Sequence, residues 1–340
     1  MMTVAITGVT GLLGGNVAET FLSAGWRVRA LGRPSSDTTH LTHLPLEWRV
    51  VSFENPDELS SALTGAEVVI HCAGVTSQSP RLSKSLNEGN IELTSRILEA
   101  CSVARVERLI HCSSTVTCGF STSPHPPVTE DRAERKTPPW PDGYFESKRA
   151  AEELAMRYKD RGDVVVVNPG YLIGPLDSKP SSGRLVLHAA RGRAPGWTEG
   201  SNNFVDVRDV GIGILGAVQS GRSGERYILG GHNLSYREFL TKVAAISGRS
   251  PPSFQLPQSL ANAAGMMGDL LERVTGKALD VNSATVGYAG WTGLRYSSEK
   301  AMRELGYRIR PIDNAIHDAI SWFSGRGLID QPTSIRPNSS

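Results

Sequence analysis

The 340-residue chain has only four cysteines, no cluster of basic residues and no metal-binding motif. The cysteines are spaced neither like metal ligands nor like a disulfide framework, and free thiols in a reducing compartment are therefore expected for Cys72, Cys101, Cys112 and Cys118. The histidines also lack paired ligand spacing, so we predict no metal. With 36 basic and 34 acidic residues, the net charge is +2. This balance gives no indication of nucleic-acid binding.

The chain also lacks a long hydrophobic run and a targeting segment. No apolar stretch approaches the ~20 residues that cross a bilayer. Residues 1–8 contain no basic region and reach a glycine too early for a signal peptide. We therefore predict a cytoplasmic protein without a transmembrane segment. Hydrophobic residues make up 39% of the chain, which is enough for a sizeable globular core.

The first half of the chain alternates short apolar runs with amphipathic segments. Strands are predicted at residues 4–7, 26–31, 48–53, 67–72, 108–112 and 163–168, and helices at 12–24, 56–63, 90–101 and 144–157. This alternation predicts an α/β fold with a doubly wound parallel sheet of the Rossmann type. The uninterrupted valines at 164–167 are typical of a strand covered on both faces.

The second half of the chain has a different pattern. Proline, glycine, serine and arginine cluster between residues 174 and 201, a short strand follows at 226–229, and helices are predicted at 235–247, 258–275 and 312–323. We expect a smaller, mostly helical substrate lobe. The expected division is a dinucleotide-binding domain at 1–168 with a return segment at about 205–231, a substrate lobe at 169–204 and 232–324, and a flexible tail at 325–340.

A glycine-rich turn joins the first predicted strand to the first predicted helix. Gly8 allows a sharp turn, Gly11 lets the backbone approach a pyrophosphate, and Gly14 lets the helix pack closely on the sheet. The helix N-terminus then offers free N–H groups to phosphate. This strand–turn–helix context predicts a nicotinamide dinucleotide site.

The residue after the second strand bears on which dinucleotide binds. NAD-binding proteins commonly place an acidic residue there, whereas this chain has Arg33. The planar guanidinium suits a 2′-phosphate and favours NADP. The nearby Asp37 keeps NAD open as an alternative.

A Tyr-x-x-x-Lys pair lies on the helix predicted at 144–157. Positions i and i+4 share a helix face, so Tyr144 and Lys148 can address one site. We expect the ammonium to lower the pKa of the phenol and so to favour proton exchange. Ser114 follows a predicted strand and can hold a substrate oxygen at the carboxyl end of the sheet.

Taken together, these motifs resemble the extended short-chain dehydrogenase/reductases of the NAD-dependent epimerase/dehydratase family. The resemblance is closest to bacterial dihydroflavonol-reductase-like and hopanoid-associated sugar epimerase proteins. It rests on the glycine turn at 7–14, on Ser114, on the Tyr144/Lys148 pair preceded by Ser147, and on stretches at 203–210, 224–231 and 304–311.

The resemblance implies roles for particular residues. Ser114, Tyr144 and Lys148 are expected to be catalytic, and Asn90 is expected on a helix that backs the site. Cofactor contacts are implied for Gly8, Thr10, Gly11, Leu12, Leu13, Gly14, Arg33, Ala73, Gly74, Tyr144 and Lys148. The resemblance also allows a homodimer.

The chain departs from the family's nucleotide-sugar enzymes at informative places. Dehydratases carry Asp-Glu after the catalytic hydroxyl, but here Thr115 and Val116 follow Ser114. Epimerases carry an arginine for the substrate diphosphate where this chain has Asn203, and an asparagine where it has Tyr171. A diphosphate would lose its charge-assisted contacts. We therefore predict a ketone or alcohol substrate without a nucleotide group.

Three functions stay open at this point. The first is an NAD(P)-dependent oxidoreductase that transfers hydride reversibly between nicotinamide and a ketone or secondary alcohol. The second is a sugar epimerase that retains tightly bound NAD, and the third is a non-catalytic protein that senses NADP. The methionine-rich helix near 260–271 can line a pocket for a lipophilic substrate or pack into the core of the second lobe, and helices normally bury such a stripe.

Overall fold

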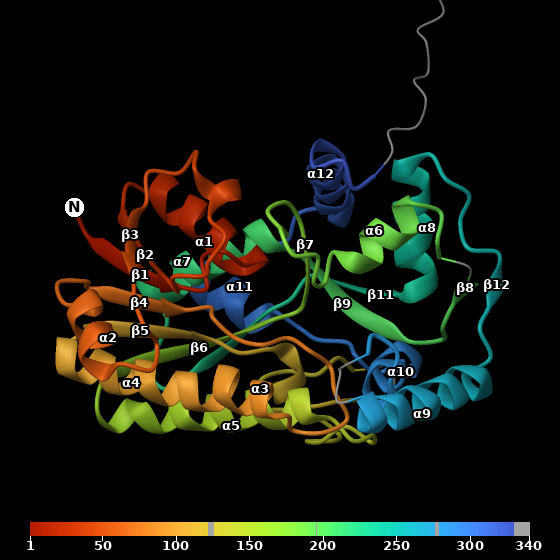
Figure 1. The fold of residues 1–340 in the computed structure, drawn as a ribbon, viewed down its shortest axis with the longest axis horizontal. Coiled ribbons are helices and arrows are strands. Elements are labelled where there is room, and N and C mark those ends of the chain that lie inside the picture. The colour runs from red at the N-terminus through yellow and green to blue at the C-terminus, as the bar shows by residue number, and fades with distance from the viewer. Residues whose placement is uncertain (122–125, 195, 276–278, 330–340) are drawn as a thin grey trace, which may run out of the picture.

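The computed structural model describes residues 1–121, 126–194, 196–275 and 279–329. The strands of the first half and one later strand form a single parallel sheet (Figure 1). Seven strands lie side by side in the order β10 (Arg226–Leu229), β6 (Asp163–Pro169), β5 (Arg108–Cys112), β4 (Val68–His71), β1 (Thr3–Thr7), β2 (Arg27–Gly32) and β3 (Glu47–Val50). All the pairings are parallel. The predicted doubly wound α/β fold is confirmed.

Helices cover both faces of this sheet (Figure 1). One face carries α1 (Leu12–Ser23) and α7 (Val207–Ser220), and the other carries α2 (Pro56–Leu63), α4 (Leu93–Ala104) and α5 (Gly143–Arg157). Successive residues of a strand point to opposite faces. In β6, Val165 and Val167 accordingly join the core beneath α1 and α7, while Val164 and Val166 join the core beneath α4 and α5. The continuous valine run is therefore buried on both sides, as predicted.

Helix α7 was not predicted. Its glycines lower helix propensity and hide the helical pattern in the sequence. In the structure they allow close packing on α1, because a Cβ atom at Gly211 would lie 2.6 Å from the Thr20 hydroxyl oxygen. The helix begins at the Asp206 N-cap, whose carboxylate accepts from the Arg208 amide at 2.9 Å. Together with β10, this segment returns the chain to the first-half sheet.

The second half contains the three predicted helices and two small sheets. The helices are α8 (Tyr236–Ser247), α9 (Gln258–Thr275) and α12 (Ile312–Gly325), and the shorter ones are α6 (Arg184–Ala190), α10 (Ser283–Gly290) and α11 (Glu299–Leu305). One sheet pairs β11 (His232–Ser235), β9 (Ser201–Asp206) and β7 (Tyr171–Ile173), and the other pairs β12 (Phe254–Gln255) with β8 (Gly196–Trp197). Strands β7, β8 and β12 have only two or three residues each, too few to show a periodicity, and β9 and β11 were not predicted either. Most of the expected flexible tail, residues 330–340, lies outside the described residues.

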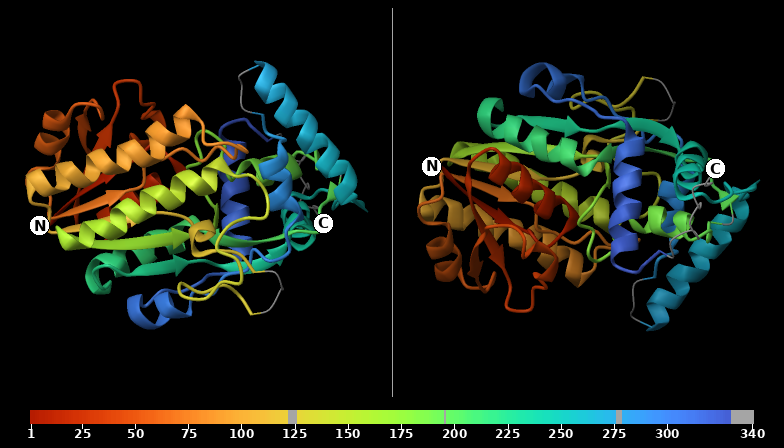
Figure 2. Two further views of the ribbon diagram at one scale, coloured as in Figure 1. Left: turned by 90° about the horizontal axis from the view of Figure 1, so that it is seen from below. Right: turned by 90° about the horizontal axis from the view of Figure 1, so that it is seen from above.

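Helix α9 lies along the outer edge of the molecule, as both views of Figure 2 show in light blue. The expectation that its methionines pack into the core is wrong, since Met266 and Met267 are 65% and 57% exposed. The helix instead contacts the protein through Gly265 and Gly268, which are its buried residues. These glycines bring the backbone of α9 against α10 and the residues just before it, so the larger side chains of α9 face solvent.

This arrangement predicts that truncations on α9 have little effect on stability. Met267→Ala and Leu270→Ala should each change the free energy of unfolding by less than about 0.5 kcal/mol, because these side chains are already in water. Leu240→Ala, in α8, is the matched control, since Leu240 is 3% exposed. That truncation should cost about 2–5 kcal/mol in urea unfolding. Equal losses at α8 and α9 would contradict the exposed position of α9.

Candidate active site

The candidate site lies where the strand order of the large sheet reverses. Strand β1 is paired with β2 on one side and with β4 on the other, so the chain runs outward from β1 in both directions. Open α/β sheets bind ligands at the carboxyl ends of their strands at such a point. Gly8 directly follows β1, Ala73 and Gly74 follow β4, and Ser114 follows β5. The predicted residues thus come to one edge of the sheet.

The glycine turn has the backbone geometry that a pyrophosphate needs. Gly8 has a φ of +74°, and a Cβ atom there would lie 2.6 Å from the amide nitrogen of Ala73. A Cβ atom at Gly14 would overlap the carbonyl oxygen of Gly8. Gly11 is the N-cap of α1 and provides no side-chain cap, which leaves amide groups at the helix start for an anion. The turn therefore fits a dinucleotide.

The other predicted cofactor contacts surround this turn. Leu12 is buried under the first turn of α1, while Thr10 and Leu13 are half-buried. Arg33 lies two residues beyond Leu31, which pairs with Thr7 across β1 and β2. The Arg33 side chain is exposed at the same edge of the sheet as the glycine turn. It is therefore positioned on the side where the adenosine end of a dinucleotide is expected.

Tyr144 and Ser114 are brought together as predicted. Helix α5 begins at Asp142, whose carboxylate caps the helix by accepting from the Phe145 amide at 3.0 Å. Tyr144 lies in the first turn of this helix, and its phenol is near enough to the Ser114 side chain for that side chain to influence its pKa. Burial raises the pKa of Tyr144 to about 12, against the lowering effect of the Ser114 side chain. The phenol is thus protonated at neutral pH.

Lys148 lies one turn further along α5 and points into the protein. Its Nζ atom donates to the Cys112 carbonyl oxygen at 3.0 Å, and a Cβ atom at Gly74 would lie 3.7 Å from it. Burial lowers the pKa of Lys148. The prediction that Lys148 lowers the pKa of Tyr144 is wrong. Burial raises the pKa of the phenol, and the influence that opposes burial comes from Ser114, not from Lys148.

Asn90 ties the end of β4 to the catalytic helix. It lies in a single π-helical turn, η2 (Asn87–Glu92), and is 2% exposed. Its Oδ1 atom accepts from the Val75 amide at 2.8 Å, and its Nδ2 atom donates to the Ser147 hydroxyl at 2.9 Å. Its Nδ2 atom also donates to the Val75 carbonyl oxygen at 3.0 Å. The family resemblance placed Asn90 behind the site, and these contacts join the segment after β4 to α5.

Asp142 is a site residue that was not predicted from the sequence. Besides capping α5, its carboxylate accepts a short hydrogen bond from the Tyr288 hydroxyl of α10. Burial raises the pKa of Asp142 to about 6. An aspartate just before a helix is a signal for a cap. Its partner, 146 residues away, has no such signal in the sequence.

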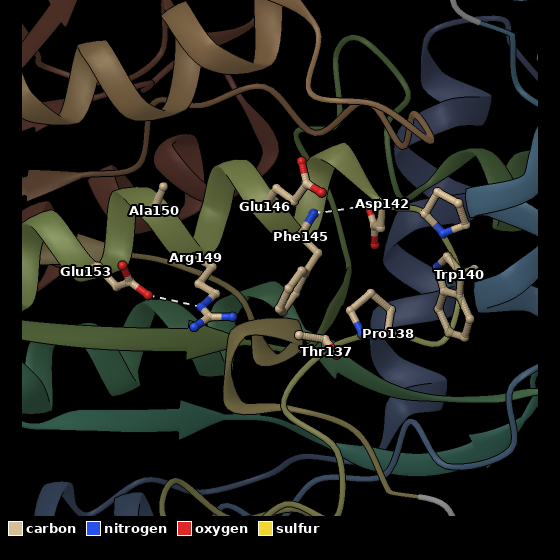
Figure 3. Close-up of a pocket in the computed structure, with 10 residues that line it drawn as sticks. Thr137, Pro138, Trp140, Asp142, Phe145, Glu146, Arg149, Ala150 and Glu153 are labelled. Carbon is tan, nitrogen blue, oxygen red and sulfur yellow. Dashed lines mark hydrogen bonds and ion pairs between the residues drawn. The ribbon is translucent and has the colours of Figure 1, made fainter.

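A cavity in the described part of the chain lies on the outer face of α5 (Figure 3). It has a volume of about 450 Å³, and Glu146, Arg149 and Glu153 line it on the helix side. Arg149 and Glu153 form an ion pair at 3.0 Å. Tyr144 and Lys148 are not among its lining residues, so this cavity is not the site defined by the glycine turn and the hydroxyl pair.

Within the ranges that the structure describes, no group of three or more histidine, cysteine, aspartate or glutamate side chains is arranged to hold a metal ion. No helix among these residues is both long and apolar enough to cross a membrane.

The parallel sheet, the glycine turn at its switch point and the Ser114/Tyr144/Lys148 set define a class of enzymes that act with a nicotinamide dinucleotide. The sequence matches the NAD dependent epimerase/dehydratase family over residues 4–230. The chain belongs to this family, which contains oxidoreductases and epimerases.

Relatives with known names match along nearly the whole chain. The protein named "Putative dihydroflavonol 4-reductase" from Synechocystis is 31% identical over 330 residues, covering 95% of both chains. Sterol demethylase protein B from Methylococcus capsulatus is 30% identical, covering 96% of this chain and all of that protein.

Solved structures show the same fold. The crystal structure of gox2253 superposes with a TM-score of 0.83 at 32% identity, over 97% of this chain and all of that one. A nucleoside-diphosphate-sugar epimerase from Pseudomonas aeruginosa gives a TM-score of 0.80 at 27% identity, over 97% of this chain and 99% of that one.

The geometry of the glycine turn gives a direct test of the cofactor site. Gly14→Ala should weaken binding of NADPH at least tenfold, because the added methyl group overlaps the Gly8 carbonyl oxygen and displaces the turn. The dissociation constant is measured by nucleotide fluorescence, with folding checked by circular dichroism. Gly325→Ala is the control, because open space surrounds a Cβ atom there. A folded Gly14→Ala variant with unchanged affinity would exclude this turn as the phosphate site.

Proposed function

We propose that the protein is an NADP-dependent oxidoreductase that transfers hydride reversibly between nicotinamide and a ketone or secondary alcohol. The observation that carries this proposal is that Ser114 and the Tyr144 phenol interact at the sheet edge that holds the glycine turn. A protonated phenol beside a second hydroxyl is suited to a carbonyl oxygen that gains a proton.

Each side chain has a distinct role in this reaction. Bound nicotinamide would supply or accept the hydride. Ser114 orients the substrate oxygen, and Tyr144 gives it a proton during reduction or takes one during oxidation. Lys148, held by the Cys112 carbonyl, faces the end of β4 at Gly74, where its ammonium can bind a ribose hydroxyl.

The substrate is proposed to have no nucleotide group. Asn203, at the position where epimerases carry an arginine, is completely buried. Its Oδ1 atom accepts from the Gly231 amide at 2.7 Å, and its Nδ2 atom donates to the Asn233 side chain at 2.8 Å. Its hydrogen-bonding groups are therefore used inside the protein and do not replace a diphosphate-binding arginine.

A lipophilic carbonyl compound is the proposed substrate class. Tyr144 packs against an apolar cluster that includes Val116, Phe120, Phe145 and Tyr288. The phenol therefore stands in apolar surroundings, which are compatible with an apolar substrate body. Two relatives have names that refer to lipophilic compounds: sterol demethylase protein B, and a ketoreductase from Stigmatella aurantiaca that is named for a farnesyl-bearing quinoline oxide and is 27% identical over 89% of this chain.

Replacement of Tyr144 tests the proposed chemistry. Tyr144→Phe should lower kcat for ketone reduction at least a hundredfold, because the proton donor is lost, while NADPH affinity changes less than about threefold. Tyr158→Phe is the matched control, since Tyr158 is a buried tyrosine just beyond the opposite end of α5. The substrate comes from a screen of lipophilic ketones followed at the NADPH absorbance. Turnover by Tyr144→Phe at the wild-type rate would contradict the catalytic assignment.

The pKa of Tyr144 predicts the pH dependence of reduction. A phenol with a pKa raised to about 12 keeps its proton throughout the neutral and mildly alkaline range. The rate of ketone reduction should therefore show no loss from Tyr144 titration between about pH 6 and pH 10 and should fall only above that range. A fall in kcat near pH 7 that persists in the Tyr158→Phe control but is absent from the residual activity of Tyr144→Phe would contradict this pKa.

Arg33 is proposed to select NADP. Arg33→Ala should raise KM for NADPH by about 10- to 100-fold through loss of the charged contact with the 2′-phosphate, and should leave KM for NADH within about twofold. Exposed Arg27, at the opposite end of β2, provides the control variant Arg27→Ala. Equal effects of Arg33→Ala on both cofactors would contradict the NADP assignment.

The epimerase alternative has its own signature. It is favoured by the likeness to the Pseudomonas nucleoside-diphosphate-sugar epimerase. An epimerase returns the hydride to its substrate and keeps its cofactor, so heat-denatured protein would release about one equivalent of NAD per chain. The proposed oxidoreductase should release far less after gel filtration. Stoichiometric NAD in the supernatant, measured by chromatography, would favour the epimerase.

A further inference from the structure

Helix α5 carries a third inward-facing polar residue in line with Tyr144 and Lys148. Glu152 lies eight residues after Tyr144 and four after Lys148, so the three side chains share one face of the helix. Glu152 is only 5% exposed, whereas the next residue, Glu153, is on the open face. A buried carboxylate is retained only when hydrogen bonds or ion pairs compensate for its lost hydration.

Three elements supply those hydrogen bonds. The Oε2 atom of Glu152 accepts from the Thr117 hydroxyl at 2.5 Å and from Asn168 Nδ2 at 2.8 Å. The Oε1 atom accepts from an Arg226 guanidinium nitrogen at 3.1 Å. Thr117 belongs to η3 (Thr115–Cys118), Asn168 to β6 and Arg226 to β10. The carboxylate thus joins α5 to η3, β6 and β10.

The same two donors also hold the Ser114 backbone. The Ser114 carbonyl oxygen lies 2.7 Å from the Thr117 hydroxyl and 3.1 Å from Asn168 Nδ2. The Thr117 hydroxyl has a single hydrogen, and the charged Glu152 acceptor competes best for it. Asn168 has two hydrogens on Nδ2, so it can donate to Ser114 and to Glu152 together. The carboxylate therefore fixes the Asn168 side chain, and it also fixes Thr117, whose backbone amide donates to the Ser114 carbonyl oxygen at 3.1 Å.

This backbone anchor leaves the Ser114 side chain for the reaction. Ser114 is the N-cap residue of η3, with an extended backbone, and its hydroxyl makes no cap hydrogen bond. The Ser114 side chain instead acts on the Tyr144 phenol, whose pKa it lowers against the effect of burial. Because Ser114 is held through its carbonyl, the backbone from which its hydroxyl projects is fixed.

We propose that Glu152 is a positioning residue that sets the Ser114 hydroxyl against Tyr144 through Thr117 and Asn168. One helix then carries both the proton donor and the carboxylate that aligns its partner hydroxyl. The expected effect of Glu152 on kcat rests on the proposed function, whereas its expected effect on the backbone order of η3 does not.

Hydrogen exchange tests the structural consequence without a substrate. Glu152→Leu removes the acceptor, and Thr117→Val removes the link while leaving the Glu152–Arg226 ion pair in place. Both should speed amide exchange in residues 113–119 at least tenfold and leave buried α4 unchanged. Glu153→Leu is the matched control on the exposed face, where Glu153 pairs with Arg149. If the folded Thr117→Val variant exchanges the amides of residues 113–119 at the wild-type rate, the proposal is overturned. This result decides the question even if Glu152→Leu does not fold.

A double-mutant cycle with Ser114→Ala tests the kinetic consequence. In the Ser114 protein, Thr117→Val and Glu152→Leu should lower kcat about tenfold with KM within about twofold, and Thr117→Ser should restore most of the rate. In the Ser114→Ala protein, neither should lower kcat more than about twofold further. Equal losses in both backgrounds would show a merely structural role and overturn the proposal. If the wild-type protein reduces no carbonyl compound, the proposed function fails and the exchange result alone decides the role of Glu152.

Discussion

The reversal of strand order between β1 and β4 is the constraint on which the site depends. It brings the end of β1 beside the end of β4, and the two are so close that Gly8 has no room for a side chain against Ala73. The same reversal leaves the start of α1 open to a ligand at the edge of the sheet. A bulkier turn would separate the phosphate end of the site from the strand end that faces Lys148.

Helix α5 gathers the chemical groups at that edge. Its first turn is fixed at Asp142 by a cap and by Tyr288 of the second half of the chain, and its inner face carries Tyr144, Lys148 and Glu152. Burial has opposite effects on the two titratable groups of the Tyr144/Lys148 pair: it raises the pKa of Tyr144 and lowers that of Lys148. The helix thereby holds a protonated phenol above an ammonium that is bound to a backbone carbonyl.

Much of the first half was predictable because its signals are local. Continuous valine runs and the glycine turn each specify their structure within a few residues, and the Tyr144/Lys148 spacing follows from the helix period. Helix α7 was missed because glycines at its packing face obscure the pattern, and β7 and β8 are too short to show one. An amphipathic pattern predicted α9, but whether a neighbour covers an apolar face depends on tertiary packing, and there the prediction was wrong. The contacts of Glu152 and Asp142 join residues up to 146 positions apart, so no local pattern revealed them.

Tyr144 and Ser114 are proposed to present a carbonyl to a nicotinamide for net hydride transfer. The most direct measurement uses NADPH that is deuterated at the transferable C4 position, with mass spectrometry of both products. The account predicts that one deuterium appears on the carbinol carbon of the alcohol and that the oxidised cofactor loses it. Recovery of all the deuterium in the cofactor, with the ketone unchanged across a panel of lipophilic carbonyl compounds, would contradict the account.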